Sequence, residues 1–201
     1  FGYNAANGDM RICGTTASLA GLEAAQRTGD AAAMELALRR IVASIGITLA
    51  AGGIPLLYLG DEVGTLNDYR YLQDVATAND ARWVHRPRAD AHHLAERHDP
   101  ATSAGRLFSA IRRMIAVRTT HPLFAATNPT QWLDVGNDAV VALTRGIAAE
   151  VLVLVNVSAA AQTIPLPPYT CHDLLSIDLY PAGEEVVLAP YAMKWLAKEA
   201  Y

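Results

Sequence analysis

The strongest constraint on the fold is a helix, a glycine pair and an apolar run that follow one another in the first third of the chain. Apolar residues recur at steps of three and four from Met34 to Leu49, which predicts one long helix that begins after Asp30. Gly52-Gly53 ends this helix, and the continuous apolar run Ile54–Leu59 follows. Such a run suits a parallel strand that is covered on both faces better than an edge strand. Together these features predict an α/β unit.

Further helices are predicted on both sides of this unit. Residues 1–14 are rich in Gly and Asn and are typical of a loop, and a helix is expected from Thr15 or Thr16 up to Gly29. Another helix is predicted from Ala104 to Thr120. The intervening residues, from 60 to 104, are charged and aromatic and show little periodicity, which is typical of a functional loop.

The sequence changes character after Pro122. The runs at 140–143, 151–155 and 186–188 are short and rich in β-branched residues, and Gly, Pro and Asn clusters separate them. Several short strands at this spacing predict an antiparallel sandwich or barrel. We therefore expect a first domain over residues 1–121 and a β-domain over residues 122–201.

Composition excludes several classes of protein. The chain has 201 residues, of which 52% are hydrophobic and 18% charged, so a disordered chain is excluded. The net charge is −4 and no dense basic run is present, which argues against nucleic acid or an anionic membrane as a partner. The longest apolar stretch, 41–59, is too interrupted by Gly, Ser, Thr and Pro to span a membrane.

The cysteines and the N-terminus indicate where such a chain would reside. Cys13 and Cys171 lie far apart with no CxxC pair and no zinc spacing, so we expect unlinked thiols in a reducing, cytoplasmic compartment. The chain starts at Phe1 rather than at Met, without a basic and apolar leader. We therefore expect an internal piece of a longer protein.

Asp61 and Glu62 follow the predicted strand and are natural acid/base candidates, because ligands bind beyond the carboxyl ends of strands in α/β folds. Adjacent strand-end residues usually point in opposite directions, however, so the two carboxyls cannot easily flank one scissile bond. The alternative, which we favour, is that both orient loops through hydrogen bonds.

Residues 81–88 contain the densest group of arginines and rings. Arginines bind carboxylates and phosphates in bidentate fashion, and Trp83 offers a flat face for a sugar or a base. For Arg86 and Arg88 we favour buried pairing with carboxylates inside the loop. His92, His93 and His98 have no defensible ligand geometry, so they are interpreted as surface residues. No GxSxG, GxGxxG or GxxxxGK[ST] pattern occurs.

Several segments resemble one enzyme family. GIPLLYLGDEVG at 53–64 resembles the last barrel strand and following turn of the α-amylase superfamily, family 13 of the glycoside hydrolases. NGDMRICGT at 7–15 and RWVHRPR at 82–88 are similar to amylosucrases and the related bacterial sucrose hydrolases, and RHDP at 97–100 and MIAVR at 114–118 continue the likeness. The resemblance is strongest from 7 to 120 and weaker in the β-domain.

The resemblance implies a fold and a reaction. The fold would be the C-terminal part of a (β/α)8 barrel, with its last strand, flanking helices and part of an inserted loop domain, followed by an antiparallel β-sandwich. The reaction would be retaining transfer of glucose from sucrose to an α-1,4-glucan through a glucosyl–Asp intermediate, with release of fructose and without a cofactor or metal. The family's catalytic carboxylates lie on segments that nothing here matches, so none of the residues of this chain is expected to be catalytic.

Two substrate-binding residues carry over from the resemblance. Arg82 matches the arginine that pairs with an Asp at the floor of the glucose pocket, and Arg11 matches an arginine on the acceptor side. The implied partners are sucrose, an α-glucan and a missing N-terminal part of the same protein.

Two alternatives remain open at this point. A sucrose hydrolase would use water as the acceptor. A non-catalytic carbohydrate-binding module is ranked last, because Trp132, Trp195 and Tyr191 are scattered and are expected in the core.

Overall fold

The computed structural model describes residues 5, 8, 10 and 12–199. The chain forms two compact units, one made of Phe1–Ile41 and Tyr58–Ser109 and the other of Val42–Leu57 and Ala110–Tyr201. This division runs through two long helices, whereas the change from helices to strands falls after Pro122. The predicted domain boundary at 121/122 therefore stays a prediction.

The first unit is helical. It contains α1 (Thr16–Leu19), α2 (Leu22–Thr28), the N-terminal part of α3 (Ala31–Ala50), α4 (Ala91–Ala95) and the start of α5 (Ser103–Thr120), with the short 3-10 helices η1 (Asp61–Val63), η2 (Tyr69–Gln73), η3 (Ala81–His85) and η4 (Glu96–His98). The predicted long helices are confirmed as α3 and α5. The single helix expected before Gly29 is wrong, because Gly21 has a φ of +96° and separates α1 from α2.

Aspartates organise the segment that was predicted to be a loop without regular structure. The carboxylates of Asp68, Asp80 and Asp90 cap η2, η3 and α4, where they accept hydrogen bonds from backbone N–H groups at the helix starts. These caps satisfy donors that a short helix otherwise leaves unpaired. Residues 60–102 are therefore a series of capped turns.

The predicted buried strand at Ile54–Leu59 is wrong in this structure. These residues form no strand, and Ile54, Leu56 and Leu59 are 93%, 84% and 73% exposed. An extended segment becomes a strand only when a neighbour pairs with its backbone, and the part of the chain that the structure describes supplies none.

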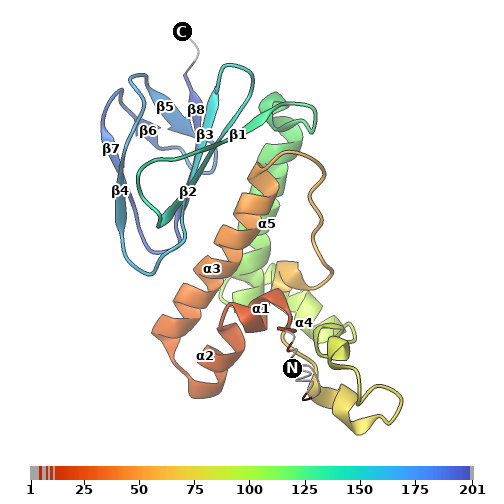
Figure 1. The fold of residues 1–201 in the computed structure, drawn as a ribbon. Coiled ribbons are helices and arrows are strands. Elements are labelled where there is room, and N and C mark those ends of the chain that lie inside the picture. The colour runs from red at the N-terminus through yellow and green to blue at the C-terminus, as the bar shows by residue number, and fades with distance from the viewer. Residues whose placement is uncertain (1–4, 6–7, 9, 11, 200–201) are drawn as a thin grey trace. The chain divides into compact units, whose positions relative to one another are not determined.

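The second unit is built on antiparallel strands. The described strands are β1 (Thr130–Leu133), β2 (Val140–Arg145), β3 (Val151–Asn156), β4 (Gln162–Pro165), β5 (Cys171–Asp173), β6 (Leu179–Tyr180), β7 (Glu185–Leu188) and β8 (Met193–Lys198), after the 3-10 turn η5 (Pro122–Phe124). Among the described residues, six strands form one sheet in the order β1-β2-β3-β8-β5-β6, and β4 pairs with β7 (Figure 1). The expected antiparallel sandwich is confirmed.

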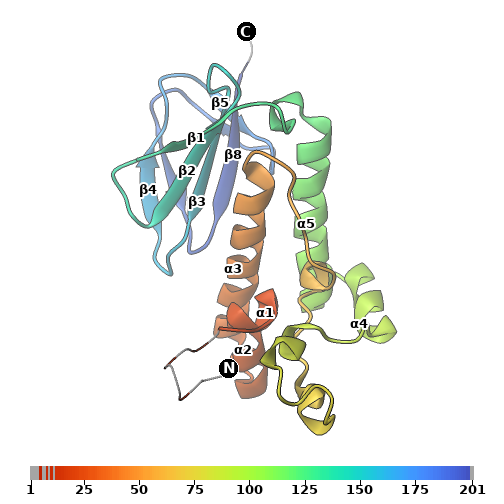
Figure 2. The ribbon, with the colours of Figure 1, turned by 45° about the vertical axis from the view of Figure 1, so that its right-hand side comes forward.

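Both faces of the larger sheet are buried within this unit. One face packs with β4 and β7 around Leu154, Leu188 and Leu196. On the other face, Phe124 stacks on the fully buried Trp195 with ring centroids 4.8 Å apart. The C-terminal parts of α3 and α5 run side by side in this unit, where the Arg118 guanidinium donates to the carbonyls of Ala51 and Gly53 (Figure 2).

The aromatic residues of the β-domain do not all follow the prediction of a core position. Trp195 is buried and Tyr191 is half-buried, but Trp132 is 57% exposed because it lies on the edge strand β1. Among the described residues, no helix combines the length and apolar character that crossing a bilayer requires.

Candidate functional site

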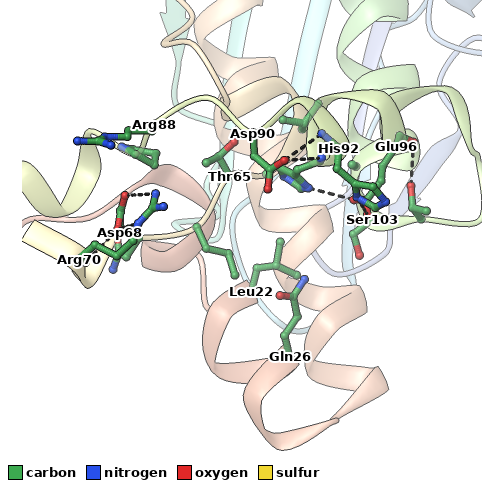
Figure 3. A pocket seen from close by; sticks show the side chains of 18 residues that line it. Leu22, Gln26, Thr65, Asp68, Arg70, Arg88, Asp90, His92, Glu96 and Ser103 are labelled. Carbon is green, nitrogen blue, oxygen red and sulfur yellow. Dashed lines mark hydrogen bonds and ion pairs between the residues drawn. The ribbon is translucent and has the colours of Figure 1, made fainter.

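The largest cavity described in the first unit has a volume of about 640 Å³ and lies against α4. This α4 cavity is lined from α2, from the turns between η1 and α4, and from the start of α5 (Figure 3). Its polar side chains are Gln26, Thr65, Asn67, Asp68, Arg70, Arg88, Asp90, His92, His93, Glu96, Thr102 and Ser103. The carboxylates, guanidiniums and hydroxyls together offer both donors and acceptors to a polar ligand.

An Asp68–Arg70 ion pair forms one side of the α4 cavity. The Arg70 Nε donates to Asp68 Oδ1 at 2.8 Å and its Nη2 to Oδ2 at 2.5 Å, a bidentate arrangement. The Arg70 guanidinium thereby lowers the pKa of Asp68 to about 2. Asp68 is consequently a fixed acceptor at neutral pH and cannot serve as a general acid.

The α4 end of the cavity holds a second polar cluster. The Asp90 Oδ1 accepts from the backbone N–H of His92 at 2.9 Å, and the Nδ1 of His93 lies 3.0 Å from Glu96 Oε2 (Figure 3). The side chain of His92 is 89% exposed and His98 is exposed, as predicted, whereas His93 is half-buried by its contact with Glu96. Hydrogen bonds within the turn therefore fix this end of the cavity.

A smaller cavity of about 240 Å³ adjoins the end of the Ile54–Leu59 segment and is lined by Asp61, Thr65 and His85 among others. Burial raises the pKa of Asp61, and a hydrogen bond with Thr16 opposes this shift. The Glu62 Oε2 instead turns back to accept from the Gly60 N–H at 2.7 Å. Glu62 thus orients its loop, as we favoured, whereas Asp61 faces a cavity.

No metal-binding constellation was found in the described part of the chain. The structure gives no group of three or more His, Cys, Asp or Glu side chains there that could hold a metal ion. Cys13 is half-buried and Cys171 is buried, and both are free thiols. Burial raises the pKa of Cys171, which disfavours its reactive thiolate form.

Comparison with known proteins gives sequence relatives and structural neighbours. No family model matches the chain. Glucosylglycerate phosphorylase from Escherichia coli (strain K12) is 26% identical over 161 residues, which are 78% of this chain and 28% of that protein. The chain thus spans less than a third of the length of this relative.

The structural neighbours match the same C-terminal portion of larger chains. AmyP in complex with maltose gives a TM-score of 0.63 at 18% identity, over 80% of this chain and 34% of that one. Trehalulose synthase MutB from Pseudomonas mesoacidophila MX-45 gives 0.56 at 19% identity, over 80% of this chain and 38% of that one. The fold is that of the C-terminal part of a family 13 barrel enzyme with its β-sandwich domain. The comparisons support the α-amylase superfamily.

Of the two predicted substrate-binding residues, the structure describes Arg82 but not Arg11. Arg11 lies outside the described residues. Arg82 lies on the surface in η3, with its side chain 56% exposed, and its Nε and Nη2 each donate to the Asp80 carboxylate at 2.8 Å. Arg82 is not among the residues that line the cavities described above. Its role in a glucose pocket therefore remains a prediction.

The expectation that Arg86 and Arg88 are buried against carboxylates is wrong. Both are exposed, and the Arg86 guanidinium lies over the Trp83 ring, 5.6 Å from its centroid. The physical reason is that the aspartates of this segment cap local turns at the surface, so nothing encloses the arginines.

Sequence reasoning missed the Asp68–Arg70 and Asp80–Arg82 pairs. Their signal is a repeated Asp-x-Arg pattern, Asp68-Tyr69-Arg70 and Asp80-Ala81-Arg82, in which the carboxylate caps a 3-10 turn and also binds the arginine two residues later. This pattern could have located both pairs from the sequence alone.

Proposed function

We propose that this chain is part of a retaining α-glucosyl-transferring enzyme that takes glucose from sucrose and passes it to an α-1,4-glucan. The observation that carries the proposal is the coincidence of amylosucrase-like segments at 7–15 and 82–88 with a family 13 fold. The neighbours support a glycoside as substrate, since AmyP is solved with maltose and with maltotriose. The sequence relative is named for a glucosyl compound.

In this proposal the chain contributes binding groups and not the reacting carboxylates. Retaining chemistry needs two carboxyls on either side of the glycosidic bond. Asp68 and Asp80 are each held by an arginine that lowers the pKa to about 2, and Glu62 is engaged with Gly60. The nucleophile and the acid would be supplied by other segments of the complete protein.

A second candidate differs only in the acceptor. The sequence relative is a phosphorylase, which favours inorganic phosphate as the group that receives glucose. A sucrose hydrolase would use water instead. These reactions share the cleavage of sucrose and are distinguished by the glucosyl product.

The test is product analysis with the full-length protein and sucrose, in buffer alone, with added α-glucan and with added phosphate. The proposal predicts fructose release with glucan elongation. Free glucose as the main product would identify hydrolysis, and glucose 1-phosphate would identify phosphorolysis. Absence of fructose release under all three conditions would overturn the assignment to sucrose and leave the binding-module alternative.

A variant tests the predicted role of Arg82. If its guanidinium closes the glucose pocket, Arg82→Ala lowers the rate of sucrose cleavage at least about tenfold while the far-UV circular dichroism stays unchanged. Arg39→Ala is the matched control, because Arg39 forms an exposed ion pair with Glu35 on α3. Equal sucrose kinetics in both variants would refute the role of Arg82.

A further inference from the structure

Trp83 lines a further cavity of about 230 Å³ in the first unit. This Trp83 cavity has the volume of about eight water molecules at roughly 30 Å³ each, so it suits one small polar molecule or one ring of a larger one. Trp83 is 39% exposed, and Tyr71 lines the cavity with it. Partly exposed aromatic rings are flat apolar surfaces on which the C–H face of a sugar ring can pack.

The polar side chains of the Trp83 cavity present both donors and acceptors. The Arg88 guanidinium has no carboxylate partner within the described part of the chain, and that of Arg86 lies over the indole. The Thr77 hydroxyl donates to the Tyr71 carbonyl at 2.9 Å, which leaves its oxygen able to accept. One carboxylate oxygen of Asp74 accepts from the Ala76 N–H, and the other has no protein donor in the described structure.

This mixture favours a neutral polyhydroxylated ligand over an anion. A sugar hydroxyl both donates and accepts, so it can satisfy the guanidiniums and the Asp74 carboxylate together. A phosphate would satisfy the guanidiniums but would be repelled by Asp74, because like charges at close range oppose binding. Arg70 offers little to an anion, since the Asp68 carboxylate already neutralises it.

The Trp83 cavity adjoins the α4 cavity. Both are lined by Asp68, Arg70 and Arg88, so the ion pair forms a common wall. Figure 3 shows Arg88 on the same side of the α4 cavity as this pair. A ligand bound at Trp83 could therefore extend past the ion pair into the α4 cavity, whose volume of about 640 Å³ leaves room for further rings.

We propose that the Trp83 cavity binds one pyranose unit of an oligosaccharide, with the next units in the α4 cavity. The proposal rests on the proposed function for the carbohydrate class and adds a binding place that the reaction itself does not require. Its chemical basis is the ring face of Trp83 together with the donor groups of Arg88 and the acceptor oxygen of Asp74.

The test is titration of the full-length protein with maltotriose in the absence of sucrose. Binding is measured by calorimetry and by tryptophan fluorescence. Trp83→Ala and Arg88→Ala are each expected to weaken binding at least about tenfold. Two variants are used because Trp83→Ala could perturb η3, whereas Arg88 is exposed and its guanidinium has no ion-pair partner in the described structure. Trp132→Ala is the control, because Trp132 is also exposed but lies on β1.

Each outcome decides the proposal. Unchanged affinity in Trp83→Ala and Arg88→Ala would overturn it, as would phosphate binding that depends on Arg88 while maltotriose binding does not. Wild-type protein that cleaves sucrose but does not bind maltotriose would overturn this inference and leave the proposed function intact. Maltotriose binding that depends on Trp83, without any sucrose cleavage, would support the inference and refute the proposed function.

Discussion

At the scale of single residues, Arg145 in β2 has no charged partner in the described structure although it is fully buried. Its guanidinium donates to the carbonyls of Leu123 and Ala125 and to the Thr130 hydroxyl, and lies 5.9 Å from the Phe124 ring centroid. The side chain thus ties the η5 turn to the sheet. A buried charge is tolerated when its hydrogen bonds are made, and removing the donor leaves its acceptors without a hydrogen bond.

Arg145→Met is therefore expected to lower the free energy of unfolding by about 2–4 kcal/mol, because the partly buried Leu123 carbonyl and the Thr130 hydroxyl lose the guanidinium that donates to them. Guanidinium chloride unfolding measures this change. Arg113→Met is the control, since Arg113 is exposed on α5 and its loss should cost about 0.5 kcal/mol or less. A similar midpoint in both variants would contradict the structural role of Arg145.

Burial of His121 makes the stability of this chain depend on pH. Its Nδ1 is buried without a hydrogen-bond partner, and burial lowers the pKa of His121 below the ordinary value of 6.5. The unfolded chain then binds the proton more readily than the folded chain. The contribution of neutral His121 to the unfolding free energy is therefore complete above about pH 6.5 and is lost as the pH falls through the folded-state pKa.

His121→Leu should consequently flatten the fall in unfolding free energy between about pH 7 and pH 5. Denaturant unfolding across this range is the measurement. His92→Gln, at a side chain that is 89% exposed, should keep the wild-type profile. If His121→Leu and wild type lose stability in parallel, the buried imidazole is not the source of the pH dependence.

At the scale of elements, α5 depends on a glycine in its first turn. A Cβ on Gly105 would overlap the backbone carbonyl of Asp99, so the preceding turn packs directly on the helix backbone. The Gly105 N–H donates to the Thr102 hydroxyl at 3.0 Å, which also holds the start of the helix against this turn. Backbone atoms cannot move aside as the end of a side chain can.

Gly105→Ala is therefore expected to destabilise the chain, although alanine favours an isolated helix over glycine by about 1 kcal/mol. The sign of the change in thermal midpoint is the observable. Gly46→Ala in α3 is the matched control, because a Cβ there would meet the flexible end of Met193. A higher midpoint for Gly105→Ala than for wild type would refute the packing argument.

The elements also show which local patterns predicted the structure. The apolar spacing from Met34 to Leu49 predicted α3, because helical spacing alone places such residues on one face, and Leu38, Ile41 and Leu49 are buried. The break at Gly21 was missed, since glycine is also tolerated within helices and only its φ of +96° reveals the turn.

At the scale of the whole molecule, Ile54–Leu59 is an apolar segment without a strand partner in the described residues. An exposed apolar segment of this kind is a site for association with other chains. The predicted partner, an N-terminal part of the same protein, remains a proposal. It would explain why a sequence suited to a buried parallel strand is solvent-exposed here.

The 201-residue chain by itself is expected to self-associate through this segment. Ile54→Ser together with Leu56→Ser should reduce light scattering and the binding of a hydrophobic dye, without lowering the unfolding free energy. Ile177→Ser is the control, because Ile177 is 99% exposed but lies in another part of the chain. Equal scattering from all variants would show that association arises elsewhere.

The candidate site was only partly predictable. The sequence predicted a functional loop after Gly60 and singled out Trp83, Arg86 and Arg88, because charged and aromatic residues without periodicity gather there. It did not predict which carboxylate pairs with which arginine. Asp68 and Asp80 bind the arginines two residues later, and this depends on the turn that each aspartate caps.

The sequence by itself determined the long helices, the position of the change from helices to strands, and the resemblance to family 13 enzymes, because each of these depends on residues close together in the chain. Only the tertiary structure decided the exposure of Ile54–Leu59, the surface position of Arg86 and Arg88, and the common wall between the Trp83 and α4 cavities. The physical reason is that a strand, a buried ion pair and a cavity all require groups from distant segments, and local spacing does not specify which of them meet.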